Sequence, residues 1–180
     1  MINVTIEDSI LVAKFNNPPT NSIAFQTMVD LRAAMKQAAE DSSIKGIILT
    51  ADGKFFSSGF NLPTFLKFKT REDVLEFFNV EEEMLFEIFT FPKPMVAAVN
   101  GHMTAGGMIS AMGCDYRIVK NHPKIKLGMS EIKIGLGLTV AEMELMRFGL
   151  DSNRILRNVM YFGEMVDVNT ALQRQIVDEI

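Results

Sequence analysis

The chain has 180 residues, 48% of them hydrophobic and 22% charged, which is the composition of a folded globular protein and excludes wholesale disorder. Its 18 lysine and arginine residues against 22 aspartate and glutamate residues give a formal net charge of −4, so no nucleic-acid partner is expected. The single cysteine, Cys114, excludes an internal disulfide and is typical of a reducing compartment.

The first half of the chain is predicted to contain short strands and two long helices. The N-terminus has no basic or apolar signal segment, which favours a cytoplasmic protein. Short β-rich or buried apolar runs predict strands at 2–6, 10–15 and 45–50, the first two forming a hairpin at Asp8 and Ser9. Helical periodicity predicts helices at 24–40 and 71–91. The acidic residues of the second helix are expected to form a solvated face: Glu76, Glu81, Glu82, Glu83 and Glu87.

The second half begins with 21 residues, 94–114, that carry no charged side chain and are long enough to cross a bilayer. Glycines interrupt this run, so it is interpreted as a buried strand at 95–99, a turn, and a buried helix at 106–111, with no membrane partner. Further strands are predicted at 115–119 and 124–127, with 176–177 as a candidate last strand. Helices are predicted at 139–148, 152–161 and 169–173. Strand pairs followed by helices indicate an α/β fold over a single domain, residues 1–180.

Three segments could carry chemistry. Residues 99–107 lead from a strand through a glycine-rich turn into a helix, where free N–H groups and the helix dipole can hold an oxyanion. Residues 55–62 form a second loop at a strand exit. Glu131 lies among apolar residues, which raises a carboxyl pKa and suits proton transfer, although these residues alone favour an exposed glutamate paired with Lys133. The spacing matches neither a phosphate loop nor a dinucleotide fingerprint.

Five segments in order make the chain similar to the crotonase, or enoyl-CoA hydratase/isomerase, superfamily. They are residues 56–62 (FSSGFNL), 93–101 (KPMVAAVNG), 105–107 (AGG), 114–118 (CDYRI) and 130–135 (SEIKIG). The resemblance covers nearly the whole chain. It implies a crotonase-like spiral of ββα units in which the usual C-terminal helical segment is absent or shortened. It also implies a homo-oligomer, with a trimer as the family's usual assembly.

The resemblance further implies an acyl-coenzyme A thioester as substrate, with no separate cofactor and no metal. The N–H groups of Phe60 and Gly106 would hold the thioester oxygen and stabilise an enolate. Glu131 would be the catalytic carboxylate. The remaining expected substrate-binding residues are Ser58, Leu62, Gly107 and Ile109. The segment around Ser58, Phe60 and Leu62 would line the adenine end of coenzyme A.

Ile109 decides which reaction is expected. Hydratases of the family carry a second glutamate three residues beyond the oxyanion glycine, and here that position is Ile109. An absent acid–base group costs roughly 10²–10⁴-fold, so efficient hydration is not expected. One carboxylate suffices to move a double bond, and an apolar Ile109 discourages water, so the chain looks like the Δ3,Δ2-enoyl-CoA isomerase branch.

Other enolate chemistry stays open at this point: a decarboxylase, a dienoyl-CoA isomerase, a thioester hydrolase or a weak hydratase. A catalytically silent acyl-CoA-binding subunit is the alternative of a different class. The shortened C-terminal segment and Ile109 motivate this last alternative. Three other positions also depart from the family pattern. Asn61 replaces a common Asp, Phe60 replaces a common Ala, and residues 136–140 lack the usual proline- and glycine-rich turn. His102 and His122 have no role in this scheme.

Overall fold

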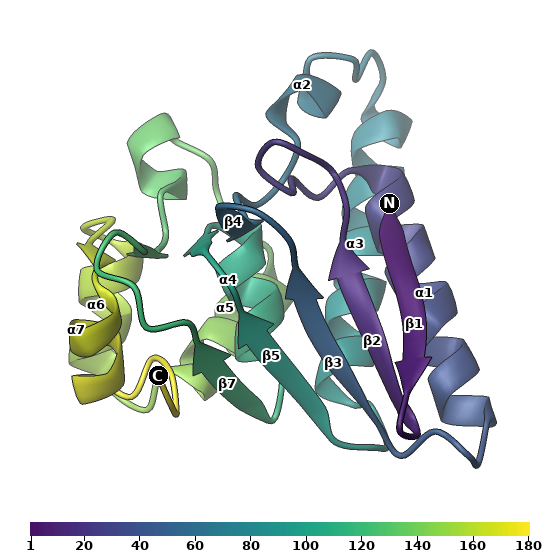
Figure 1. Ribbon diagram of the computed structural model, residues 1–180. Coiled ribbons are helices and arrows are strands. Elements are labelled where there is room, and N and C mark those ends of the chain that lie inside the picture. Colours follow the sequence, from purple (N-terminus) through teal and green to yellow (C-terminus); the bar gives the residue numbers. More distant parts are fainter.

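The computed structural model describes residues 1–180 and contains two β-sheets (Figure 1). The larger sheet has the strand order β1 (Ile2–Glu7), β2 (Ile10–Phe15), β3 (Gly46–Ala51), β5 (Met95–Val99) and β7 (Tyr116–Val119). Only the predicted hairpin β1–β2 is antiparallel. The smaller sheet has the order β4 (Phe55–Ser57), β6 (His102–Thr104), β8 (Leu127–Gly128) and β9 (Met165–Val166), with only β8–β9 antiparallel.

Successive strand pairs divide between the two sheets. β3, β5 and β7 enter the larger sheet, and the strand that follows each of them, β4, β6 or β8, enters the smaller one. Helical segments follow each pair: α2 (Leu62–Phe65) and α3 (Arg71–Phe89), then α4 (Gly106–Met112), then the 3₁₀ helix η1 (Glu131–Ile134) and α5 (Val140–Gly149). This repetition is the spiral of ββα units predicted from the sequence.

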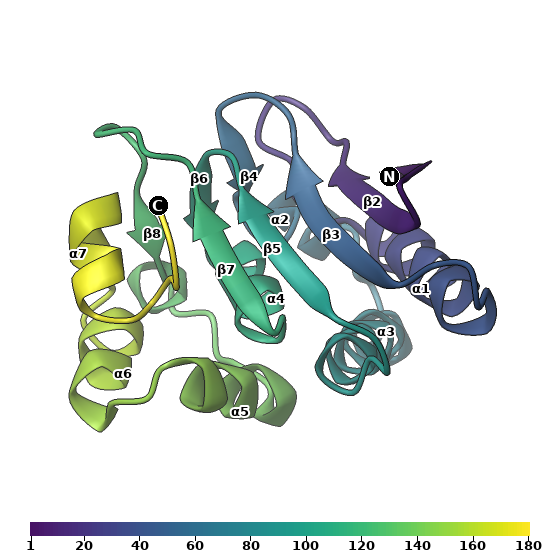
Figure 2. The ribbon, with the colours of Figure 1, turned by 60° about the horizontal axis from the view of Figure 1, so that its bottom comes forward.

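The helices cover one face of the larger sheet, where α1 (Phe25–Glu40), α3 and α5 lie side by side below the strands in Figure 2. β2, β5 and β7 alternate between buried and more accessible residues, as expected when one face of a sheet is covered. Thr70 and Thr139 begin α3 and α5 with reciprocal capping boxes, which satisfy otherwise unpaired backbone N–H groups. α6 (Asn153–Met160) and α7 (Val168–Gln173) complete the chain's helices.

Two expectations from the sequence are wrong, one for residues 176–177 and one for Glu81. Residues 176–177 form no strand. Ile176 donates its N–H to the Ala171 carbonyl in the turn that follows α7, so the apolar pair reports burial rather than β-structure. Glu81 does not belong to a solvated face, because its side chain is fully buried on α3.

The uncharged run 94–114 divides into β5, β6 and α4. No helix in the structure has the length and hydrophobicity needed to cross a bilayer.

Candidate active site

Three consecutive parallel strands bring the predicted site segments to one edge of the smaller sheet. β4 pairs with β6, and β6 pairs with β8, so the carboxyl ends of all three strands face the same way. The chain leaves β4 toward Phe60, leaves β6 into Gly106, and leaves β8 toward Glu131. Segments that are about 70 residues apart in the sequence (60 to 131) therefore meet at one place.

Gly59 allows the first two of these segments to touch. A Cβ on Gly59 would lie 2.5 Å from the Cβ of Ala105 and 2.8 Å from the backbone N of Gly106. Gly59 also has φ of +85°, a conformation that L side chains rarely adopt. Ala105 itself has φ of 56°, a strained conformation for alanine that turns the chain from β6 into α4.

Two backbone N–H groups at this junction have no acceptor within the protein. Phe60 lies outside every helix and strand, and its N–H donates no hydrogen bond, although the neighbouring Asn61 N–H donates to the Ile23 carbonyl at 2.9 Å. Gly106 is the first residue of α4, so its N–H has no partner within the helix. These are the two donors that the sequence analysis singled out, and neither N–H has an acceptor within the folded chain.

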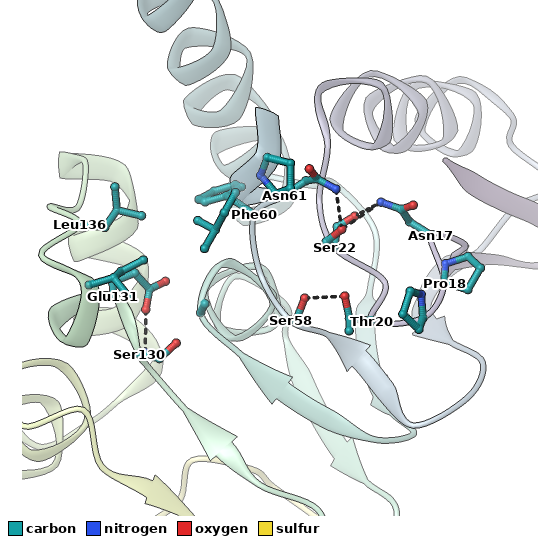
Figure 3. A pocket seen from close by; sticks show the side chains of 15 residues that line it. Asn17, Pro18, Thr20, Ser22, Ser58, Phe60, Asn61, Ser130, Glu131 and Leu136 are labelled. Atoms are coloured by element: carbon teal, nitrogen blue, oxygen red, sulfur yellow. Dashed lines mark hydrogen bonds between the residues drawn. The ribbon is translucent and has the colours of Figure 1, made fainter. Parts of the chain in front are cut away.

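A cavity of about 470 Å³ opens beside these donors (Figure 3). Ser58, Phe60, Leu62 and Glu131 line it. In Figure 3 Glu131 lies across the cavity from Ser58. The other lining residues are Asn17, Pro18, Pro19, Thr20, Ser22, Asn61, Pro63, Ala105, Ser130, Ile134 and Leu136. Glu131 is the sole ionisable side chain among them.

The remaining predicted site residues lie behind the cavity wall. Gly106, Gly107 and Ile109 are all buried in α4 and do not line the cavity, although their neighbour Ala105 does. Gly107 has a packing role, because a Cβ there would lie 2.6 Å from the Cβ of Ser57 in β4. Ile109 is fully buried in the hydrophobic core. Its position therefore supplies no acid–base group, and its expected effect on water stays a prediction.

Glu131 is a buried carboxylate with one oxygen left unpaired. Only 6% of the residue is exposed. Its Oε2 accepts a hydrogen bond of 2.8 Å from the Ser130 N–H, whereas Oε1 is buried without a partner. Burial raises the pKa of Glu131, and hydrogen bonds from its own N–H and that of Ser130 partly offset the rise. A carboxylate with a raised pKa is a stronger base once it is ionised. The alternative of an exposed glutamate paired with Lys133 is wrong.

Two further buried glutamates lie beyond Glu131, away from the cavity. Burial raises the pKa of Glu142 on α5 to about 7, and the charges of Glu131 and Glu82 contribute to the rise, although a backbone hydrogen bond from Thr139 opposes it. Burial also raises the pKa of Glu81 on α3 to about 9, with contributions from the charges of Glu142 and Glu82. Both Glu81 oxygens are buried without a hydrogen-bond partner. The sequence analysis missed this pair, because glutamates on amphipathic helices usually face water.

The Phe60 side chain closes the cavity on the side of α3. A Cβ on Gly106 would lie 3.3 Å from the Phe60 ring, so the ring covers that glycine. The ring also packs edge-on against Phe77, with 5.7 Å between centroids, and lies 6.3 Å from Phe65. Phe68 and Phe78 extend this aromatic cluster along α2 and α3. The bulk of Phe60 therefore narrows the cavity without using up its backbone N–H.

The loop between β2 and α1 forms the wall that sequence reasoning did not assign to the site. Asn17 donates through Nδ2 to Ser22 Oγ at 3.0 Å, and Asn61 Nδ2 donates to the same oxygen at 3.0 Å. Ser58 Oγ donates to Thr20 Oγ1, also at 3.0 Å. Residues 16–21 (NNPPTN) are turn-forming residues typical of a loop, but they give no sign of which segment that loop faces. No group of three or more His, Cys, Asp or Glu residues is placed to hold a metal ion.

Comparisons with known proteins identify the family. The sequence model described as enoyl-CoA hydratase/isomerase matches residues 5–180. The chain is 30% identical over 135 residues to a Bacillus subtilis protein named a probable enoyl-CoA hydratase, covering 75% of this chain and 52% of that protein. It is 27% identical over 172 residues to the human mitochondrial enoyl-CoA delta isomerase 1, covering 95% of this chain and 56% of that protein.

A solved structure of an enoyl-CoA hydratase/carnithine racemase from Magnetospirillum magneticum superposes with a TM-score of 0.91 at 23% identity, covering 99% of this chain and 67% of the other, and shares the fold. The chain therefore belongs to the enoyl-CoA hydratase/isomerase family, and its fold is the crotonase fold. It spans about half the length of the curated relatives it matches. Both hydratases and isomerases occur among these relatives, so family membership alone does not choose between the two reactions.

Proposed function

We propose that the protein is an acyl-CoA isomerase that moves a C3–C4 double bond of an enoyl-CoA to C2–C3. The observation that carries the proposal is the lone acid–base side chain in the cavity, Glu131, at the edge where two unpaired backbone N–H groups lie. Hydration requires a group to activate water and a second group to protonate carbon. Ile109 occupies the position where family hydratases carry their second glutamate, so this chain offers one group only.

The reaction needs one proton carrier and one place for negative charge. The Glu131 carboxylate removes a proton from C2 and leaves its electron pair delocalised over the thioester as a dienolate. The N–H groups of Phe60 and Gly106 donate to the developing oxyanion, each contributing roughly 2.7–4 kcal/mol. The protonated Glu131 then returns its proton at C4. The double bond now lies between C2 and C3, and no atom is gained or lost.

Burial prepares Glu131 for both halves of this exchange. An ionised carboxylate with an unpaired oxygen in an apolar wall accepts a proton readily, because burial penalises its charged form. Burial favours the neutral form, so the protonated carboxyl holds its proton beside the dienolate until C4 takes it up. Coenzyme A enters as part of the thioester substrate, beside the Ser58–Leu62 segment. A trimeric assembly and a cytoplasmic location stay predictions.

Glu131→Gln tests the proposal directly, because it keeps the shape of the side chain and removes the base. We expect isomerisation of a 3-enoyl-CoA to fall by at least about 10²-fold while a saturated acyl-CoA still binds. Glu142→Gln is the matched control: it also removes a buried carboxyl, but one that does not line the cavity. Near-normal turnover by Glu131→Gln, or an equal loss in Glu142→Gln, contradicts the assignment.

Product analysis on the unmodified protein separates isomerisation from other enolate chemistry. A 2-enoyl-CoA as the only product supports the proposal. A 3-hydroxyacyl-CoA would indicate hydration, free coenzyme A would indicate hydrolysis, and carbon dioxide from a malonyl-type thioester would indicate decarboxylation. Binding of thioesters with none of these products would favour the acyl-CoA-binding subunit.

A further inference from the structure

A second polar cavity, of about 480 Å³, lies at the opposite end of the smaller sheet from the candidate active site. It is built from the turns that join β3 to β4, β5 to β6 and β7 to β8, whereas the active site uses the carboxyl ends of β4, β6 and β8. Figure 2 shows β3, β5 and β7 running in parallel, with their carboxyl ends on one side. In open α/β sheets, crevices beyond the carboxyl ends of parallel strands commonly bind ligands.

The charged residues around this cavity are all basic. Lys54, Lys120 and Lys124 line it, and no aspartate or glutamate does. None of the three lysines takes part in a salt bridge, although carboxylates pair with Lys14 and Lys36 elsewhere on the surface. In a chain with a formal net charge of −4, this is a local concentration of positive charge that the overall composition concealed. Clefts lined by one sign of charge raise the local concentration of the opposite ion.

His102 and His122 add hydrogen-bond donors to the same cavity. His102 Nδ1 accepts the Lys126 N–H at 3.1 Å, and His122 Nδ1 accepts the Lys124 N–H at 3.2 Å. A ring nitrogen that accepts a hydrogen bond carries no proton, so the N–H of each ring lies on Nε2. The two histidines left without a role by the acyl-CoA chemistry therefore both line this cavity, each with a defined donor.

Gly101 packs against the turn that carries Lys54. A Cβ on Gly101 would lie 2.3 Å from the Lys54 carbonyl oxygen, so the two turns touch backbone to backbone. Asn100 supports the same junction by donating through Nδ2 to the Gly53 carbonyl at 3.1 Å. The β3–β4 and β5–β6 turns are thus held against each other by packing and by a hydrogen bond, which fixes the backbone that carries Lys54.

We propose that this cavity binds a small ligand carrying a phosphate or diphosphate group. Lysine is a frequent phosphate-binding residue because its ammonium group acts as a compact charge, and neutral N–H donors complement the phosphate oxygens. A nucleic acid fits less well, since it needs an extended basic surface and the basic residues here are confined to one concavity of an acidic chain. The site lies across the smaller sheet from Glu131 and does not depend on the isomerase chemistry.

Amide chemical-shift titration of the full chain with inorganic pyrophosphate tests the proposal. We expect saturable shifts confined to the turns that contain Lys54, Gly101 and residues 120–125. The double variant Lys120→Gln/Lys124→Gln should weaken binding by at least about 10-fold. The control Lys36→Gln/Lys69→Gln removes the same charge away from the cavity and should leave the affinity unchanged within about 2-fold. Absence of saturable shifts, or equal losses in the two double variants, overturns the proposal.

Vesicles and an oligonucleotide identify the source of the phosphate. Binding to phosphatidylglycerol vesicles that the Lys120/Lys124 double variant loses, and that pyrophosphate displaces, supports the phosphate site with a lipid headgroup as its source. Pyrophosphate binding with no vesicle binding supports the same site with a soluble source. A single-stranded oligonucleotide that binds more tightly than pyrophosphate, with shifts spreading beyond the cavity, overturns the small-ligand assignment.

Discussion

Gly59→Ala separates the effect of the close contact between the Gly59–Phe60 and Ala105–Gly106 segments from the effect of simple backbone strain. Two costs are expected, since Gly59 has φ of +85° and an added Cβ would lie 2.5 Å from the Ala105 Cβ and 2.8 Å from the Gly106 nitrogen. The left-handed conformation costs an alanine roughly 1–2 kcal/mol. Overpacking against a neighbouring backbone costs roughly 1–3 kcal/mol more. The free energy of unfolding should therefore fall by about 2–5 kcal/mol in total.

Gly53→Ala is the matched control, because Gly53 has φ of +89° and nothing within 4 Å of an added Cβ. It should lose only the strain component, about 1–2 kcal/mol. Urea unfolding measures both variants. In Gly59→Ala the displaced Phe60 and Gly106 donors should also lower enoyl-CoA turnover by about 10²-fold, since misplacement by about 1 Å has that effect. Equal stability losses, or a Gly59→Ala protein with normal turnover, would refute this account of the junction.

Three further predictions concern buried titratable groups. Because burial raises the pKa of Glu81 to about 9, the folded state holds a proton that the unfolded state has released, so stability should fall with a slope of up to about 1.4 kcal/mol per pH unit between pH 7 and 9. Glu81→Gln should flatten this slope in urea unfolding, and an unchanged slope would show that Glu81 is not protonated in the fold. Burial raises the pKa of the Cys114 thiol to about 12, so a thiol reagent should modify Cys114 only after unfolding, and fast labelling of the folded protein would contradict this placement. Since the base must be ionised and its pKa is raised, kcat/KM should rise with pH through an inflection above the ordinary glutamate value of 4.5, and Glu131→Gln should lack that inflection.

Most helices and the strands of the larger sheet could be predicted from the sequence, whereas the short strands β4 and β6 could not. Apolar runs revealed β3, β5 and β7, and helical periodicity revealed α1 and α3. β4 and β6 have three residues each and acquire strand geometry only by pairing with each other, so no local pattern marks them. η1 has only four residues, so no local periodicity marks it either, although its first residue, Glu131, lines the cavity.

The sequence indicated which segments contribute to the candidate site, but it did not indicate all the residues that line the cavity. The glycine-rich turn at 99–107 indicated a place for an oxyanion, whereas family resemblance supplied the Phe60 and Gly106 donors and the role of Glu131 as base. The 16–21 loop was missed as a wall because loop residues reveal their neighbours only in the folded chain. Glu81 was misassigned for a similar reason, since helical position alone does not show which face packs on α5. The basic cavity was hidden because its lysines and histidines come from three separate turns.

The most direct test of the central claim is a structure of the complex with an unreactive, saturated acyl-CoA. The account predicts that the thioester oxygen accepts hydrogen bonds from the Phe60 and Gly106 N–H groups. It also predicts that a Glu131 carboxylate oxygen lies within about 3–3.5 Å of C2. A thioester bound elsewhere, or a Glu131 carboxylate turned away from C2 and toward bulk solvent, would contradict it.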